Sequence, residues 1–158
     1  MFFFSKSKPV LKELIEDYVD IHSHLLPGID DGSKDLNMTI ELIQSLKKIG
    51  FSQFTATPHI IKNIWDNDKS QIEALLKTTS ADLVDRGITD PFRAAAEYMM
   101  DDSFSKLLKS EPLLTIKDNY ILVEMSYINP PMQLYDILFE IRVAGYQPIL
   151  AHPERYLF

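Results

Sequence analysis

The apolar and polar positions of this chain alternate between short strand-like runs and longer segments with helical spacing. In the longer segments, apolar residues recur every three or four positions, which is typical of amphipathic helices. Five runs rich in β-branched or aromatic residues predict strands: Tyr18–His22, Phe51–Thr57, Phe92–Tyr98, Tyr120–Met125 and Gln147–Ala151. This order predicts an α/β fold, in which parallel strands are joined by right-handed crossovers.

Capping residues indicate where the helices begin and end. Asp35 is a candidate N-cap, and Gly50 a candidate stop, for the helix between the first two strands. Asn67 or Asp68 can cap a long helix towards Arg86, with this predicted buried stripe: Ile72, Leu75, Leu76, Leu83 and Val84. Further helices are predicted over Pro9–Asp17, from Asp101 or Asp102 to Lys109, and from Pro130-Pro131 to Gly145, the last with Ala144 facing inward.

Composition narrows the class of protein. The chain has 158 residues, of which 46% are hydrophobic and 25% charged, so we expect one ordinary globular domain over residues 1–158. It has no cysteine, which excludes disulfides, thiolate metal ligands and a cysteine nucleophile. The net charge of −7 argues against generic binding to nucleic acid or to anionic membranes.

The apolar cluster Met1–Phe4 opens the chain. It is too short for the apolar core of a signal peptide, and no run is long enough for a transmembrane helix. We therefore expect a cytoplasmic protein. The phenylalanines of this cluster either pack against the domain as an arm or contact a membrane or a partner.

Residues of the metal-ligating type lie at the end of the first predicted strand. Asp20, His22 and His24 are two positions apart, so along a strand their side chains point to the same face. Two imidazoles and a carboxylate on one face suit a divalent metal ion, although histidines at a polar strand end can also simply bond to the backbone.

The other two histidines and two acidic residues occupy similar positions. His59 and His152 each end a strand-like run, and Glu97 and Glu124 lie at or near the ends of two more. Because the carboxyl ends of parallel strands meet at one rim of a sheet or barrel, these side chains should converge. Histidine with carboxylate is a usual ligand set for Zn, Mn or Fe, so the sequence predicts a metal cluster.

Six separated motifs resemble the bacterial PHP-domain (polymerase and histidinol phosphatase) family, and most of all its manganese-dependent protein-tyrosine phosphatases of capsular and exopolysaccharide loci. The motifs are Asp20–His24, Ile29–Gly32, Thr57–His59, Ala95–Tyr98, Val123–Met125 and Ala151–Tyr156. The resemblance implies a distorted (β/α)7 TIM-like barrel with a trinuclear metal site. A downstream Asp-x-His motif of that family is missing, so we expect a C-terminally incomplete barrel of about five strands. Its open strand edge and uncovered apolar surface favour self-association.

The resemblance also implies roles for individual residues. Glu97 matches a bridging carboxylate, and Asp31 an acid that serves both metal binding and catalysis. Arg155 matches a catalytic arginine that holds phosphate, for which its fork of donors is suited, although its chemistry fits a surface ion pair equally well. The implied metal ligands are His22, His24, Asp31, His59, Glu97, Glu124 and His152.

These features lead to a functional hypothesis. We expect metal-dependent hydrolysis of phosphotyrosine by a water that Mn²⁺, or else Fe or Zn, activates. The lack of cysteine fits this route, since no cysteinyl-phosphate intermediate can form. By resemblance, the partner is a phosphotyrosine-containing tail of a bacterial tyrosine kinase of polysaccharide export. The alternatives are another phosphate monoester, such as histidinol phosphate, and a truncated binding module without catalysis.

Overall fold

The computed structural model describes residues 17–158. The helix expected over Pro9–Asp17, apart from Asp17 itself, and the apolar cluster Met1–Phe4 lie outside the described residues. Among residues 17–158, no helix has the length and apolar character needed to span a membrane.

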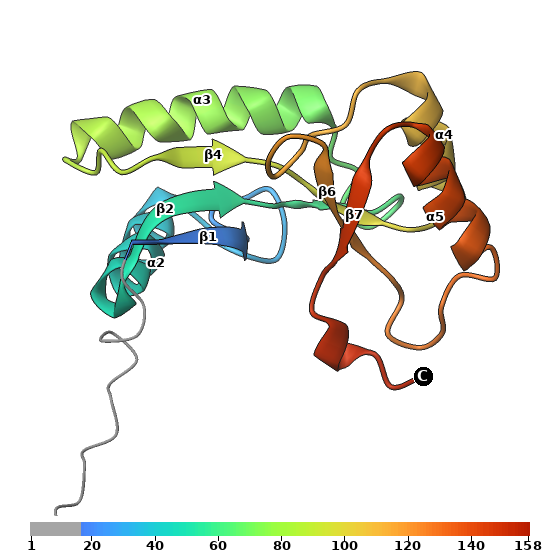
Figure 1. Cartoon of the computed structure of the whole chain (residues 1–158). Helices are drawn as coiled ribbons and strands as arrows, with labels where there is room; N and C mark the ends of the chain where they lie inside the picture. The colour runs from blue at the N-terminus through green and yellow to red at the C-terminus, as the bar shows by residue number, and fades with distance from the viewer. Residues whose placement is uncertain (1–16) are drawn as a thin grey trace, which may run out of the picture.

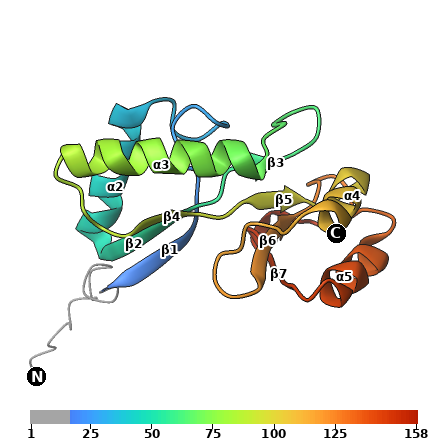
Figure 2. The same ribbon diagram turned by 90° about the horizontal axis from the view of Figure 1, so that it is seen from above.

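The described strands form two small sheets that lie next to each other (Figure 2). The first sheet has the order β1-β2-β4 and contains β1 (Tyr18–Ser23), β2 (Phe51–Ala56) and β4 (Phe92–Ala94). The second has the order β3-β5-β6-β7 and contains β3 (His59–Ile60), β5 (Glu97–Met99), β6 (Tyr120–Glu124) and β7 (Gln147–Leu150). Every pairing between these strands is parallel, which confirms the predicted α/β class.

One of the five predicted strands, Phe92–Tyr98, is interrupted, so the prediction of a continuous strand there was wrong. It breaks at Ala95-Ala96 and resumes as β5. The strand predicted over Phe51–Thr57 is present as β2, and after Thr57-Pro58 the chain forms the further short strand β3. Backbone hydrogen bonds continue across the break, because the Glu97 N–H donates to the Pro58 carbonyl at 3.0 Å. The two paired segments therefore pass together from the first sheet into the second, and this places His59 beside Glu97.

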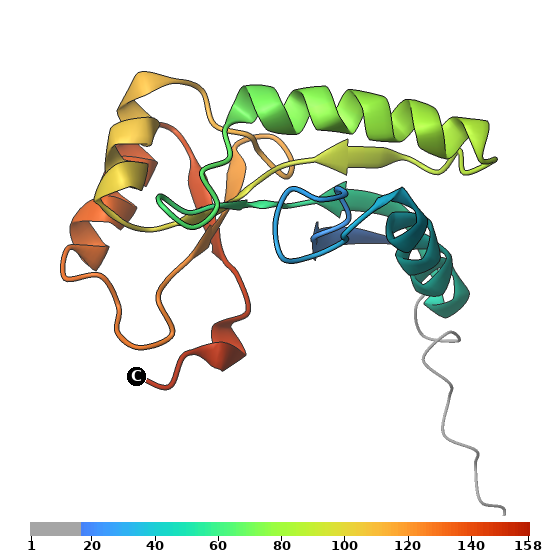
Figure 3. The same ribbon diagram turned by 180° about the vertical axis from the view of Figure 1, so that it is seen from behind.

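Helices connect the strands as predicted. They are α2 (Leu36–Ile49), α3 (Lys69–Asp85), α4 (Asp102–Ser110) and α5 (Leu134–Val143), followed by a 3₁₀ turn over Pro153–Arg155. Helix α3 lies along β4 (Figures 1 and 3), and α2 packs against β2. Asp35, Asp68 and Asp101 accept hydrogen bonds from backbone N–H groups of the first turns of α2, α3 and α4, so three predicted caps are confirmed.

Three helix predictions need correction. Helix α5 begins at Leu134, not at Pro130-Pro131, and Ala144 at its end is exposed. Val84 of α3 is 57% exposed, although its neighbour Leu83 is buried. Adjacent helical positions lie about 100° apart around the axis, so a narrow buried stripe that contains Leu83 excludes Val84. Thr79, four residues before Leu83, is buried in its place.

Strand alternation separates the main core from the functional side of the sheets. Ile121 and Val123 of β6 belong to the large apolar core, to which all four helices contribute. Leu122, between them, points to the other face, where it packs with Ala95 and Ala151 in a second, small apolar cluster. Glu124 shares this second face with Leu122, so the side chains of metal-ligating type lie away from the helices.

Candidate metal centre

Four histidines surround the carboxylate of Glu97, the first residue of β5. Glu97 is completely buried. Its Oε2 lies 3.1 Å from His22 Nε2, 3.3 Å from His24 Nε2 and 3.4 Å from His59 Nδ1. Its Oε1 lies 2.9 Å from His152 Nε2. Four imidazoles, from the end of β1, the start of β3 and the segment after β7, thus meet at the carboxylate that begins β5. Parallel topology brings such segments to one rim.

Glu124, at the end of β6, adds a second buried carboxylate. Its Oε1 lies 2.9 Å from His59 Nδ1, and its Oε2 lies 3.7 Å from His152 Nε2. Although the first pair is close, neither atom has a hydrogen-bond partner of acceptable geometry. Neighbouring ligand atoms, each about 2.1 Å from one ion, lie about 3 Å apart, so the arrangement fits two ligands of a shared metal.

The Asp30-Asp31 turn places its two acids differently. The buried Asp30 Oδ2 is 2.7 Å from His24 Nδ1 and accepts a hydrogen bond from the His59 backbone N–H at 3.1 Å. The side chain of Asp31, the predicted ligand, is 67% exposed, and its Oδ1 lies 3.6 Å from His59 Nε2. The sequence analysis predicted Asp31 as a metal ligand and did not name Asp30, although both residues belong to the motif Ile29–Gly32.

The charges of the cluster stabilise one another. Burial alone would raise the pKa of Glu97, but hydrogen bonds from His22 and His24, together with the charges of His22 and His59, hold it well below its usual range. Burial alone would lower the pKa of His24, but hydrogen bonds to Asp30 and Glu97, and the charges of both, raise it to about 10. The carboxylates therefore attract cations strongly, and a metal ion that binds His24 must displace a proton from its imidazole.

The donor set fits divalent metals. Three groups of side chains each bring ligand atoms within 4.8 Å of one another: His22, Glu97 and His152; His24, His59 and Glu97; and His24, Asp30 and Asp31. Glu97 belongs to two of these groups, which is the position of a bridging carboxylate. Imidazole nitrogens with carboxylate oxygens suit Mn, Fe or Zn. The structure brings six of the seven predicted ligands into contact and leaves Asp31 at the edge, while the ligand assignments themselves stay predictions.

Arg155 lies at the rim of a pocket of about 490 Å³ that the cluster lines. His152 adopts left-handed backbone angles (φ 31°, ψ 58°), a strained conformation for a residue other than glycine, and the chain then turns through the short 3₁₀ segment. The Arg155 guanidinium donates to the Tyr127 hydroxyl at 3.0 Å. Tyr127 follows β6 by three residues, and no sequence signal pointed to it.

A family model described as "Capsular polysaccharide synthesis, CpsB/CapC" matches residues 18–158. The chain belongs to the CpsB/CapC family. This match confirms the family resemblance that the six motifs indicated.

Individual relatives agree with this assignment. Tyrosine-protein phosphatase YwqE of Bacillus subtilis is 28% identical over 138 residues, which cover 87% of this chain and 54% of YwqE. Tyrosine-protein phosphatase CpsB of Streptococcus pneumoniae is 29% identical over 146 residues, which cover 87% of this chain and 57% of CpsB. The chain thus spans about half the length of the curated relatives it matches.

A solved structure supports the fold of this CpsB/CapC chain. It comes from work on YwqE of Bacillus subtilis and CpsB of Streptococcus pneumoniae, described as unique metal-dependent tyrosine phosphatases. The match has a TM-score of 0.79 and 27% identity, and it covers 87% of this chain and 56% of the other. The matched 87% of this chain therefore has the fold of the corresponding part of these phosphatases.

Proposed function

We propose that this CpsB/CapC chain is a metal-dependent protein-tyrosine phosphatase domain. The observation that carries the proposal is the buried Glu97 carboxylate with four imidazoles within 3.4 Å of its oxygens. A structural glutamate needs one or two partners, whereas this arrangement brings four imidazoles to one carboxylate. The names of YwqE and CpsB as tyrosine-protein phosphatases support the choice of reaction.

Several residues would hold the metal ions. His22 and His152 would act from one side of Glu97, and His24 and His59 from the other, with Glu97 shared between them. Divalent ions held there would acidify water and offset the charge of the phosphoryl group. We propose Mn²⁺ as the physiological metal, with Fe and Zn as the alternatives that the same donors accept.

Two residues would act on the substrate beside the metal ligands. The exposed Asp31 carboxylate faces the pocket close to His59, where it can accept a proton from the attacking water. Arg155 can release its bond to the Tyr127 hydroxyl and fork onto two phosphate oxygens. The cluster, Asp31 and Arg155 line one pocket, so a phosphate bound there contacts all three.

The proposed partner is a phosphotyrosine-containing protein tail of a bacterial tyrosine kinase of polysaccharide export. The family description, capsular polysaccharide synthesis, supports this setting. The proposal places the protein in the cytoplasm, where nucleotide-dependent kinases act, and it includes self-association of the chain. A small phosphate monoester such as histidinol phosphate is the alternative substrate for the same chemistry.

The test is the release of phosphate from a phosphotyrosyl peptide by the purified chain after chelation and reloading with Mn²⁺. We expect turnover with Mn²⁺ and none after chelation. The same assay with histidinol phosphate separates the two substrate classes. A chain that retains Mn²⁺ but hydrolyses neither ester would be a binding module, and the enzymatic proposal would then be wrong.

A further inference from the structure

A buried aspartate contacts two of the candidate metal ligands without being one of the predicted ligands. The side chain of Asp30 is completely buried. Its Oδ2 lies 2.7 Å from His24 Nδ1 and accepts a hydrogen bond from the His59 backbone N–H at 3.1 Å. Its Oδ1 accepts a hydrogen bond from the Gly32 backbone N–H at 3.0 Å. Both oxygens are thus engaged by nitrogen donors of the protein, as buried carboxylates require.

The place of Asp30 determines how the His24 ring is oriented. The ring turns Nδ1 to Asp30 and Nε2 to Glu97, whose Oε2 is 3.3 Å away. A carboxylate that accepts the Nδ1 proton keeps that nitrogen protonated, so the lone pair of Nε2 is left for a metal ion. His24 therefore presents one defined nitrogen to the centre of the cluster.

The neighbouring acid differs from Asp30 in burial and in direction. The Asp31 side chain is 67% exposed and lines the pocket of the metal centre. A carboxylate at the surface of that pocket can reach an ion. Asp30 instead faces the Nδ1 side of the His24 ring, while Nε2 points to Glu97. The two adjacent aspartates are therefore suited to different tasks, Asp31 to contact with an ion and Asp30 to holding a ligand.

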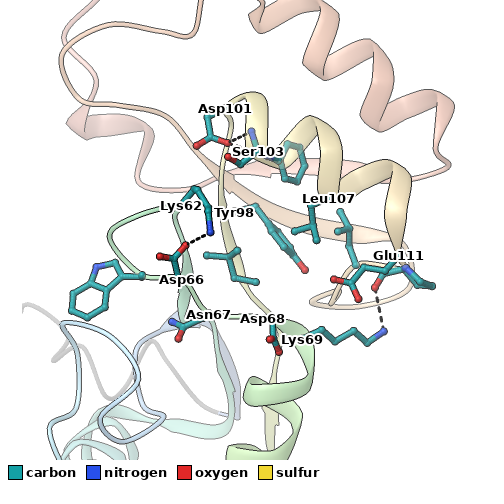
Figure 4. Close-up of a pocket in the computed structure, with 15 residues that line it drawn as sticks. Lys62, Asp66, Asn67, Asp68, Lys69, Tyr98, Asp101, Ser103, Leu107 and Glu111 are labelled. Atoms are coloured by element: carbon teal, nitrogen blue, oxygen red, sulfur yellow. Dashed lines mark hydrogen bonds and ion pairs between the residues drawn. The ribbon is translucent and has the colours of Figure 1, made fainter.

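A second polar side chain joins the same two segments. Asn67 directly precedes Asp68, the N-cap of α3, and Figure 4 shows the two side by side at the start of that helix. The Asn67 side-chain amide donates to the His59 carbonyl at 2.9 Å and to the Ile29 carbonyl at 3.0 Å. Because Ile29 directly precedes Asp30, one amide ties the turn that contains Asp30 to strand β3.

We propose that Asp30 and Asn67 are positioning residues of the metal centre, which hold His24 and His59 at a fixed spacing. The two rings have their centroids 4.5 Å apart, and both approach Glu97 Oε2. One histidine directly follows β1 and the other begins β3, so their spacing depends on the bonds that join these segments. Asp30 binds the ring of the first and the backbone of the second. The inference rests on the proposed function, since it concerns the ligands of the same centre.

Mn²⁺ titration of the Asp30→Asn chain tests the first of the two residues. Asparagine keeps the shape of the side chain but replaces one accepting oxygen by an NH₂ group, which cannot accept a hydrogen bond. The Mn²⁺ affinity should fall by about 10- to 100-fold, as when the partner behind a metal-bound histidine is lost. The number of ions bound at saturation should stay the same, because no ligand is removed. Asp82→Asn, the same change at an exposed residue of α3, is the control and should keep the wild-type affinity.

Asn67→Asp tests the second residue. Aspartate keeps the size of the side chain but offers no N–H group, so its oxygens would face two carbonyls. The Mn²⁺ affinity should again fall by at least about tenfold. Asn37→Asp, the same change at an exposed residue of α2, is the control. A variant that melts at a lower temperature but binds Mn²⁺ as tightly as the wild type would show that Asn67 serves the fold alone.

The wild-type chain provides a readout that needs no variant of Asp30. Zn²⁺ has a filled d shell, so NMR of the histidine nitrogens in the Zn²⁺-loaded chain shows which nitrogen carries a proton and which binds the metal. For His24, whose signals are assigned by their loss in His24→Gln, we expect the proton on Nδ1 and the metal on Nε2. Zn²⁺ bound to Nδ1 of His24 would contradict a positioning role for Asp30.

The outcomes separate this inference from the proposed function. Wild-type Mn²⁺ affinity in Asp30→Asn, or one ion fewer at saturation in that variant, would show that Asp30 does not position His24, while the proposed function stands. Failure of the wild-type chain to bind Mn²⁺ would overturn the proposed function itself, and this inference with it.

Discussion

Arg155 lies at the rim of the metal centre, outside the group of metal-ligating side chains, and its guanidinium donates a hydrogen bond to the Tyr127 hydroxyl. Because an arginine stays protonated, it cannot serve as a metal ligand. We predict that Arg155→Ala leaves the Mn²⁺ content intact but lowers kcat/KM for a phosphotyrosyl peptide by roughly tenfold to a thousandfold, as for a lost charged contact in the transition state.

The lysine variant is the control for this prediction. Arg155→Lys should restore only part of the loss, because a point charge cannot fork onto two oxygens. Unchanged turnover in the alanine variant would mean that Arg155 forms only a surface ion pair. Loss of Mn²⁺ from the same variant would show that Arg155 acts through the metal-ligating side chains.

His24 and Glu97 make the stability of the metal-free protein depend on pH. The pKa of His24 is raised from 6.5 to about 10, so its favourable interactions are complete below pH 6.5 and are lost as the pH rises through about 10. The pKa of Glu97 is lowered from 4.5, so its contribution is present above pH 4.5 and is lost as the pH falls towards its folded pKa. The metal-free protein should therefore be most stable between about pH 4.5 and 6.5.

Metal binding should reverse this trend on the alkaline side. A metal ion competes with the proton on His24, so stabilisation by Mn²⁺ should grow as the pH rises from 6.5 towards 10, while the metal-free protein loses stability. Thermal melts with chelator and with Mn²⁺ across this interval test the prediction. A metal-free Tm that rises with pH over the same interval would contradict it.

At the scale of elements, the turn between β1 and α2 positions the first ligands. A Cβ added at Gly32 would lie 2.2 Å from the His24 Cβ and 2.4 Å from the His24 carbonyl oxygen. The backbone N–H of Gly32 also donates to Asp30 Oδ1 at 3.0 Å. We predict that Gly32→Ala destabilises the protein by about 1–3 kcal/mol and weakens Mn²⁺ binding, because the turn must move away from His24.

Denaturant unfolding and Mn²⁺ titration measure the two effects of Gly32→Ala. Gly87→Ala is the control, since its added Cβ meets no atom within 4 Å. Its φ of 79° makes it costly for backbone reasons, so it should lower stability without changing Mn²⁺ affinity. Equal Mn²⁺ affinities in both variants would mean that the turn does not hold the ligands.

The sequence predicted the elements better than their interruptions. Caps such as Asp35 and Asp68 act through local hydrogen bonds, which a sequence window contains. The break at Ala95-Ala96 depends on pairing between segments far apart in the chain, so no local pattern revealed it. The sequence could not separate Asp30 from Asp31, because both are aspartates in the same turn. Only the conformation of the turn determines which carboxylate points inward.

At the scale of the whole molecule, an apolar stripe on α5 is uncovered. Tyr135, Phe139 and Val143 are four residues apart and are 85%, 70% and 70% exposed. Strand β7 lies at the edge of its sheet among the described strands. Exposed stripes of this kind and open edges favour association with another chain.

We predict that the chain self-associates as its concentration rises and that Phe139→Lys lowers the apparent mass measured by light scattering. Lys77→Glu, a charge change on the exposed side of α3, is the control and should leave the mass unchanged. A monodisperse monomer across the concentration range, with a cooperative melt, would overturn this prediction.

The convergence of the candidate site was predictable at this scale, because parallel topology brings strand ends to one rim. His22, His59, Glu97 and His152 meet for this reason although they are spread over 131 positions of the chain. The hydrogen bond between Arg155 and Tyr127 was not predictable, since it depends on the conformations of the loops that follow β6 and β7. Loop conformations of this kind follow from packing and leave no periodic signal.

The Mn²⁺ content of the purified chain tests the central claim most directly. After loading and dialysis, mass spectrometry of the metal should find at least one Mn²⁺ retained per wild-type chain. Glu97→Gln keeps the shape of the side chain but removes the charge that four histidines share, so it should lose the metal and the phosphotyrosyl-peptide turnover together. Glu73→Ala, a change at an exposed acid of α3, should retain both. Full metal content in the Glu97→Gln protein, or none in the wild type, would contradict the account.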